Sequence, residues 1–262
     1  MEFSVSGIGA WGPGFHDWAS LRAILTGEEN EGNKEFSSPQ PDSIPARERR
    51  RAPLSVKLAV EVASQACGMA GLQPAETACV FASSMGDMDI TDYMCRTVVS
   101  DQPAVSPTRF HNSVHNAPVA YWSISGGCML SSNAVAAGEN TVAVSLLEAI
   151  NQCCMEKTPV LWASQDIASP LPFRCIFEID QPCAFSLLIK PGSGDGIRPF
   201  YARLEPGDGT WMKCKTPALS HLYETNPTAR ILGLLEALGA DPASDAFRLP
   251  LNHHLDLWLE SL

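Results

Sequence analysis

Positive charge is scarce in this 262-residue sequence, which has 18 lysines and arginines against 29 aspartates and glutamates and a formal net charge of -11. Affinity for nucleic acids rests mainly on lysine and arginine neutralising phosphates, so we expect no binding to DNA or RNA. No stretch reaches the roughly 18 uninterrupted apolar residues that a membrane helix needs, and the first residues lack the basic and apolar regions of a signal peptide. We therefore expect a cytoplasmic protein without membrane insertion.

Motifs for disulfide frameworks and metal sites are also missing. The nine cysteines are scattered through apolar segments without a CxxC pair, which is typical of free thiols in a reducing compartment. His111 and His115 are four residues apart and would share one face of a helix, but neither an HExxH motif nor a third ligand accompanies them. We expect no metal and no cofactor, and we interpret both histidines as hydrogen-bonded interface side chains.

The hydrophobic content of 45% is enough for a large core, and strands alternate with helices through the first two-thirds of the chain. This order predicts an α/β layered fold. The patterns predict strands at residues 3–7, 78–83, 129–134, 159–164, 183–189, 200–204, 247–251 and 255–259, and helices at 18–25, 54–71, 87–99 and 230–238, with a further helix after residue 138. Residues 27–45 are polar and predict a surface loop.

A GxGxxG motif at residues 7–12 follows the first predicted strand. A dinucleotide site needs a helix that opens directly from these glycines and an acidic residue at the end of the next strand. Pro13 and Gly14 interrupt the required helix here, and the second clear strand lies far downstream. The motif therefore does not predict nucleotide binding.

Residues 105–149 are the most informative segment. They read VSPTRFHNSVHNAPVAYWSISGGCMLSSNAVAAGENTVAVSLLEA and predict a loop, a helix, a Gly-Gly turn, a short strand, a small-residue elbow at residues 133–138 and a long amphipathic helix. A strand, a sharp turn and a helix in this order present one side chain beside a row of backbone N–H groups, where nucleophiles and acyl oxygens are usually handled. The elbow, Asn-Ala-Val-Ala-Ala-Gly, contains no nucleophile.

These features resemble β-ketoacyl synthases of the thiolase-like superfamily. The stretch SPTRFHNSVHNAP is most similar to short ketosynthase-like proteins of aryl-polyene and related polyketide clusters, and the opening GIGAWGP is similar to the start of ketosynthases. The resemblance implies a thiolase-like layered α/β fold that is mainly the first half of a ketosynthase. It implies a ketosynthase-like N-terminal domain at residues 1–205, and a short C-terminal α+β extension at residues 206–262 that is not of ketosynthase type and packs on it.

The resemblance also places the reactive cysteine of the family at Val135, when Gly126 and Gly138 are matched to the first and last glycines of the family pattern. A valine cannot attack a thioester, and nothing after Gly209 resembles the catalytic loops of the second half of a ketosynthase. Cys128 is the alternative nucleophile, and a structural buried thiol is its competing interpretation. Ser83 and Ser84 resemble the strand end that approaches the acyl site in the family.

Ketosynthases dimerise through the segment that follows the Ser-Pro motif, and its side chains reach the acyl tunnel of the partner. The resemblance therefore implies an interface or tunnel role for Phe110, His111, Asn112, His115, Asn116, Tyr121 and Trp122. Ordinary packing in the core is the alternative for the three aromatic residues. The dimer surface would include residues 110–124 and 129–134.

Four arginines, Arg47, Arg49, Arg50 and Arg51, stand together in an otherwise acidic sequence. They predict a docking site for an acidic acyl carrier protein, and a solvated basic loop is the alternative.

The resemblance to a ketosynthase without its nucleophile implies a chain-length factor, which is a catalytically silent subunit of a β-ketoacyl-[acyl carrier protein] synthase complex. Such a subunit pairs with an active ketosynthase as a heterodimer and shapes its acyl tunnel during aryl-polyene, polyketide or fatty-acid-like elongation. One alternative is an active acyl-transferring or condensing enzyme that uses Cys128, or Ser131 and Ser132, with His111 or His115 as the base. Another alternative is an adaptor that binds a carrier protein through the arginines alone.

Overall fold

The computed structural model describes residues 1–28, 35–101, 103–194, 196–239 and 246–262. Residues 29–34 of the predicted surface loop lie outside this part. The described strands form one eight-stranded sheet in the order β3-β2-β4-β5-β1-β6-β8-β7. Their bounds are β1 Glu2–Trp11, β2 Ala78–Ala82, β3 Ser132–Val135, β4 Val160–Asp166, β5 Cys183–Pro191, β6 Arg198–Pro206, β7 Ala246–Asn252 and β8 Leu255–Ser261. The strand order confirms the predicted α/β fold.

Nine α-helices and four 3-10 helices are described along the chain. The α-helices are α1 Trp18–Leu25, α2 Ala46–Arg49, α3 Leu54–Ala70, α4 Met88–Val98, α5 Pro107–His111, α6 Ala117–Gly126, α7 Thr141–Glu156, α8 Ser220–Thr225 and α9 Leu232–Gly239. The 3-10 helices are η1 Pro74–Glu76, η2 Gly138–Asn140, η3 Pro217–Leu219 and η4 Pro227–Ile231. Among the described residues, no helix has both the length and the apolar character that a membrane span requires.

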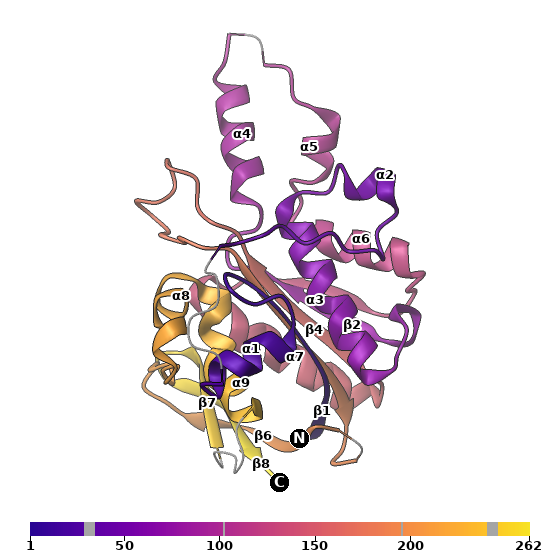
Figure 1. The fold of residues 1–262 in the computed structure, drawn as a ribbon, viewed down its shortest axis with the longest axis vertical. Coiled ribbons are helices and arrows are strands. Elements are labelled where there is room, and N and C mark those ends of the chain that lie inside the picture. The colour runs from indigo at the N-terminus through magenta and orange to yellow at the C-terminus, as the bar shows by residue number, and fades with distance from the viewer. Residues whose placement is uncertain (29–34, 102, 195, 240–245) are drawn as a thin grey trace.

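The sheet separates two apolar layers, because neighbouring residues of a strand point to opposite faces. Val80 and Trp162 pack with α7, α9 and η4 on one face, whereas Phe81 and Leu161 pack with α3 and α6 on the other. Figure 1 shows these layers, and also shows α4 and α5 projecting beyond the end of the sheet. The strands β2, β3 and β4 are parallel, so their carboxyl ends lie at this same end of the sheet.

The C-terminal segment continues the sheet. β6 pairs with β8, and β8 pairs with β7 in an antiparallel hairpin, so the two predicted closing strands are confirmed. The helix predicted at residues 230–238 begins earlier, as the 3-10 helix η4 at Pro227, and becomes α-helical at Leu232. Asn226 caps η4 because its side chain accepts a hydrogen bond from the Thr228 backbone N–H. This cap holds Thr228 against β4.

The GxGxxG motif has a packing role. A Cβ atom on Gly7 would overlap the Ala66 carbonyl oxygen, and one on Gly9 would overlap the Val62 carbonyl oxygen. The backbone of α3 therefore lies directly on β1, in contact that no larger residue permits. The Ser186 hydroxyl of β5 donates to the same Val62 carbonyl at 2.6 Å, which fixes α3 over the two central strands.

We predict that Gly9→Ala lowers the free energy of unfolding by at least about 2 kcal/mol, because α3 must move away from β1. Gly68→Ala is the matched control, since it lies in α3 with no atom near the added methyl group and removes a flexible residue from a helix. It should raise stability by up to about 1 kcal/mol. Urea unfolding of both variants tests this, and equal stability of Gly9→Ala and the wild type would contradict the packing role.

Candidate functional site

The elbow lies between β3 and α7, as the sequence predicts. Val135 is the last residue of β3 and pairs with Ala82 of β2. The turn is closed by Thr141, whose hydroxyl accepts from the Ala137 N–H at 2.9 Å and donates to the Gly138 carbonyl at 2.8 Å. Residues 133–138 carry no thiol, hydroxyl or amine. The structure therefore has a strand–turn–helix elbow with no nucleophile at any position of its turn.

A buried carboxylate organises the strand ends beside the elbow. Asp166, at the end of β4, accepts hydrogen bonds at 2.9 Å from the Ser83 hydroxyl, the Ser84 N–H and the Thr228 hydroxyl. The Ser164 hydroxyl lies 2.7 Å from that of Thr228. Burial raises the pKa of Asp166, and the hydrogen bonds from Ser84, Ser83 and Thr228 oppose this rise. This network, the Asp166 cluster, joins β2, β4 and η4.

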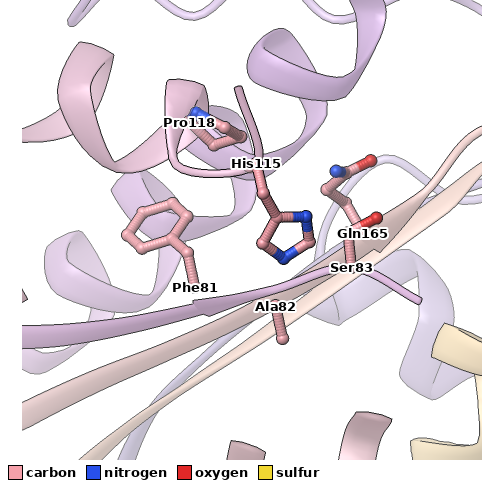
Figure 2. A pocket seen from close by; sticks show the side chains of 7 residues that line it. Phe81, Ala82, Ser83, His115, Pro118 and Gln165 are labelled. Carbon is pink, nitrogen blue, oxygen red and sulfur yellow. The ribbon is translucent and has the colours of Figure 1, made fainter. Parts of the chain in front are cut away.

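His115 connects the loop before α6 to the elbow. Its Nε2 atom lies 3.2 Å from the Val135 carbonyl oxygen, which also accepts from the Ser83 N–H at 3.3 Å. Phe81, Ser83, His115 and Gln165 line a small pocket. Figure 2 shows the His115 ring with Phe81 on one side and Ser83 and Gln165 on the other. The remaining lining of the pocket comes from Ala59, Ala82 and Pro118. His115 therefore contacts both the elbow and a pocket at the ends of β2 and β4.

The other polar residues of the predicted interface segment are divided between surface and interior. His111 and Asn116 are exposed. Asn112 is buried, and its side-chain amide donates to the Arg51 carbonyl at 3.5 Å. Asn112 therefore anchors the segment beside the arginine cluster, while His111 and Asn116 stay open to solvent.

The three candidate aromatic residues have different environments. Phe110, on α5, is 62% exposed, whereas Trp122 is 1% exposed and its ring centroid lies 6.2 Å from that of Phe81. Tyr121 is partly buried, and burial raises the pKa of its phenol. Phe110 and Tyr121 are placed where a partner can reach them, and the position of Trp122 favours its interpretation as a core residue.

The predicted arginine cluster is only partly free to bind a partner. Arg49 donates to the Pro41 carbonyl at 3.0 Å and forms an ion pair with Asp42 at 2.7 Å. Arg47, Arg50 and Arg51 are exposed. The local role of Arg49 is to hold α2 against the preceding loop, and the other three arginines form the basic surface.

The alternative nucleophiles lie away from the pocket. Cys128 is 5% exposed and its thiol donates to the Thr77 carbonyl at 3.3 Å, just before the start of β2. His115 and Ser83 lie at the other end of β2, roughly 15 Å away for a five-residue strand. Within the described residues, no hydrogen bond joins Cys128, Ser131 or Ser132 to either candidate histidine. In the same part of the chain, no group of three or more histidine, cysteine or acidic side chains could hold a metal ion.

Three residues of the site were not among the sequence candidates. Gln165 and Asp166 directly follow the strand predicted at residues 159–164 and are the last two residues of β4. A polar pair at the carboxyl end of a buried parallel strand is a signal that would have pointed to them. Thr228 carries no comparable signal, because a contact across 62 residues depends on where the C-terminal segment folds.

The sheet order, the two helical layers and the elbow correspond to the thiolase-like ketosynthase fold, and comparisons with solved structures agree. A ketosynthase (ApeO) in complex with its chain length factor (ApeC) from Xenorhabdus doucetiae matches with a TM-score of 0.73 and 19% identity, covering 99% of both chains. The ishigamide ketosynthase/chain length factor matches with a TM-score of 0.69 and 12% identity, covering 100% of both chains. AntDE:AntF, a type II polyketide synthase acyl carrier protein in complex with its ketosynthase, matches with a TM-score of 0.74 and 12% identity, covering 100% of this chain and 99% of that chain.

The sequence matches the β-ketoacyl synthase N-terminal domain over residues 22–211. The chain therefore belongs to the β-ketoacyl synthase family, and the predicted family is confirmed. A comparison with curated protein sequences finds no significant match.

We predict that Asp166→Asn preserves the fold and becomes more stable relative to the wild type as pH rises. A carboxyl whose pKa is raised by folding stabilises the protein fully below its ordinary value, and this contribution is lost as pH rises through the folded-state pKa. Asparagine mimics the protonated acid, because its oxygen accepts from Ser83 and Ser84 while its amide donates to Thr228. Asp166→Ala leaves those donors without an acceptor and should cost about 3 kcal/mol.

Thermal unfolding between about pH 4 and pH 8 measures this difference. Glu224→Gln, which alters an exposed carboxyl, should leave the pH profile of the wild type unchanged. A difference between Asp166→Asn and the wild type that stays constant with pH would contradict the buried-carboxyl assignment.

Proposed function

We propose that this chain is a non-catalytic ketosynthase-like subunit, a chain-length factor, that pairs with an active β-ketoacyl synthase and shapes its acyl tunnel. The observation that carries the proposal is an intact elbow without a nucleophile, within a fold of the ketosynthase family. Covalent acyl transfer requires a thiolate or an equivalent nucleophile, so a partner must supply it. Similar solved structures include two ketosynthase–chain length factor complexes, which supports this assignment.

The proposed pairing surface is the β3 edge and the residues beside it. In the described sheet β3 pairs on one side only, with β2, so its other edge offers free backbone groups to a partner strand. Ile124 is 82% exposed and Met129 is 94% exposed. Apolar side chains next to an open strand edge favour burial in a complex over exposure to water.

Phe110 and Tyr121 are the proposed tunnel residues, because both are accessible and both lie in the segment that the family uses for dimerisation. Trp122 would support them from the core through its contact with Phe81. The elongating chain would be an aryl-polyene, polyketide or fatty-acid-like acyl group.

Arg47, Arg50 and Arg51 would attract an acidic acyl carrier protein to the side of the subunit that carries the interface segment. They are exposed, and the Arg51 carbonyl contacts Asn112 of the interface segment. Basic side chains steer an acidic partner mainly by long-range attraction, which salt weakens. One similar solved structure contains a carrier protein with its ketosynthase.

Two alternative functions, an active enzyme and a carrier-protein adaptor, predict different experimental results. An active enzyme using Cys128 predicts an acyl adduct on the purified chain, and the buried position of that thiol opposes it. An adaptor predicts salt-sensitive binding of a carrier protein through the arginines without a stable ketosynthase complex. The exposure of three arginines is compatible with the adaptor, whereas the exposed β3 edge favours a paired subunit.

We predict that the tagged chain, purified gently from its native cell, forms a one-to-one complex with a cysteine-containing ketosynthase. Met129→Arg should abolish this complex, because it places a charge in the apolar pairing surface. Met155→Arg is the matched control. Met155 is 74% exposed on α7, and its neighbour Cys154 contacts Glu2 of β1, three strands away from the β3–β2 pair.

Mass spectrometry identifies the partner, and light scattering gives the stoichiometry. Recovery of the chain as a monomer or homodimer without a ketosynthase would contradict the proposal. Equal loss of the complex in both methionine variants would contradict the assignment of the β3 edge.

We predict that Phe110→Ala or Tyr121→Ala shifts the products of the reconstituted complex toward greater length, since each removes an aromatic ring from the proposed tunnel. Product masses report the shift. Leu204→Ala, on β6 and 49% exposed, is the control that should leave the products unchanged. Unchanged product length in both aromatic variants would remove the tunnel role.

A further inference from the structure

Helix α4 is fixed to the rest of the subunit at its base. The Ser55 hydroxyl of α3 donates to the Asp87 carboxylate at 2.6 Å, and this carboxylate also caps α4 by accepting from the Ile90 N–H at 2.9 Å. Met88 and Ile90, in the first turn of α4, are 3% and 7% exposed. Because its cap is bonded to α3 and its first turn is buried, α4 projects beyond the sheet in a fixed direction (Figure 1).

Helix α5 lacks these features and depends on its neighbours. It has five residues, none of them buried, and Ser106 makes no side-chain cap hydrogen bond at its start. Helices this short are not stable on their own in water, so contacts with other elements must hold α5 in place. Phe110, a proposed tunnel residue, is on this helix and is 62% exposed. The packing of its own side chain therefore does not fix its position.

Tyr93, on α4, supplies two contacts to α5. Its hydroxyl accepts from the Ser106 N–H at 3.0 Å, directly before the first residue of α5. Its ring lies beneath the Arg109 guanidinium, whose central carbon is 4.1 Å from the ring centroid. A cation in this position is attracted by the electrons of the ring face. Tyr93 therefore holds α5 at its start and at the residue next to Phe110.

A third contact lies beyond the end of α5. The Asn112 side-chain amide donates to the Arg51 carbonyl at 3.5 Å. This distance is longer than that of the hydrogen bond between Ser106 and Tyr93 and exceeds the usual range for a strong hydrogen bond. The position of α5 therefore depends chiefly on Tyr93.

We propose that Tyr93 is a positioning residue for Phe110 and thereby helps to set the length of the acyl product. This inference rests on the proposed function, in which Phe110 lines the acyl tunnel of the paired ketosynthase. Tyr93 acts through α5. With both of its contacts in place, Phe110 is presented to the tunnel in one position. Without them α5 loosens, so losing Tyr93 has the same kind of effect as losing the Phe110 ring.

The first measurement uses the full chain without a partner. Tyr93→Phe removes the hydroxyl that accepts from Ser106 and keeps the ring beneath Arg109. We expect the Ser106 N–H, followed by NMR, to exchange with water about fivefold faster in this variant, as expected for the net loss of one hydrogen bond. Tyr201→Phe, on β6, is the matched control and should leave this rate unchanged, since β6 and α4 lie at opposite ends of the molecule (Figure 1).

The second measurement is the length of the products of the reconstituted complex, by mass spectrometry. Tyr93→Ala should shift the products in the same direction as Phe110→Ala, and Tyr93→Phe, which keeps the ring, should give a smaller shift that remains measurable if Tyr93→Ala does not fold. In the Phe110→Ala background, Tyr93→Ala should add no further shift, because the ring that Tyr93 positions is already absent. Tyr201→Ala should leave product lengths unchanged.

The results separate this inference from the proposed function. A residue that only stabilises the fold would lower the amount of product and leave its length unchanged. A shift with Phe110→Ala but none with the Tyr93 variants, a further shift in the double variant, or an unchanged Ser106 exchange rate would overturn the role of Tyr93 and leave the tunnel role of Phe110 standing. Unchanged products in every variant, Phe110→Ala included, would overturn the tunnel role and the inference together.

Discussion

The buried carboxylate of Asp166 is the interaction on which the geometry of the site depends. Burying a carboxyl group away from water is unfavourable unless donors surround it, and Asp166 is surrounded by donors from β2 and from η4. Those donors are far apart in the chain, so the cluster forms only when β2, β4 and the C-terminal segment are all in place. Folding of the C-terminal segment and order at the strand ends are thereby one event.

A short series of hydrogen bonds connects the Asp166 cluster to the elbow. Asp166 holds the Ser83 hydroxyl, the Ser83 N–H donates to the Val135 carbonyl, and the same carbonyl contacts His115. Thr228 is at one end of this series and the elbow is at the other. The C-terminal segment therefore supports the elbow through Thr228.

Sequence patterns predicted the fold well because its elements are set by local rules. The boundaries of α1, β2 and α3 follow from apolar periodicity and from the proline and glycine residues that flank α3, and these boundaries agree with the structure to within one residue. The strand predicted at residues 129–134 lies later, at Ser132–Val135, because the left-handed Gly127 ends α6 and the following residues must first cross to the sheet edge. The apolar periodicity of the sequence does not show that these residues connect α6 to the sheet edge before the strand begins.

The site was predicted less completely, for reasons of distance. The elbow and its missing nucleophile are contiguous in sequence, and could be read directly. The Asp166 cluster joins residues separated by 62 and 83 positions, and no local pattern reports such contacts. Arg49 shows a further limit of the sequence, since a cluster of charges does not reveal that this side chain also forms an ion pair with Asp42 and donates to the Pro41 carbonyl.

Helix α6 gives the pocket and the proposed pairing surface a common rigid element. Pro118, at its first turn, lines the pocket, and Ile124, near its end, is exposed beside β3. The two residues lie about 9 Å apart along a helix axis, with Trp122 between them packed on Phe81, which itself lines the pocket. A partner that displaces α6 must therefore also move a wall of the pocket.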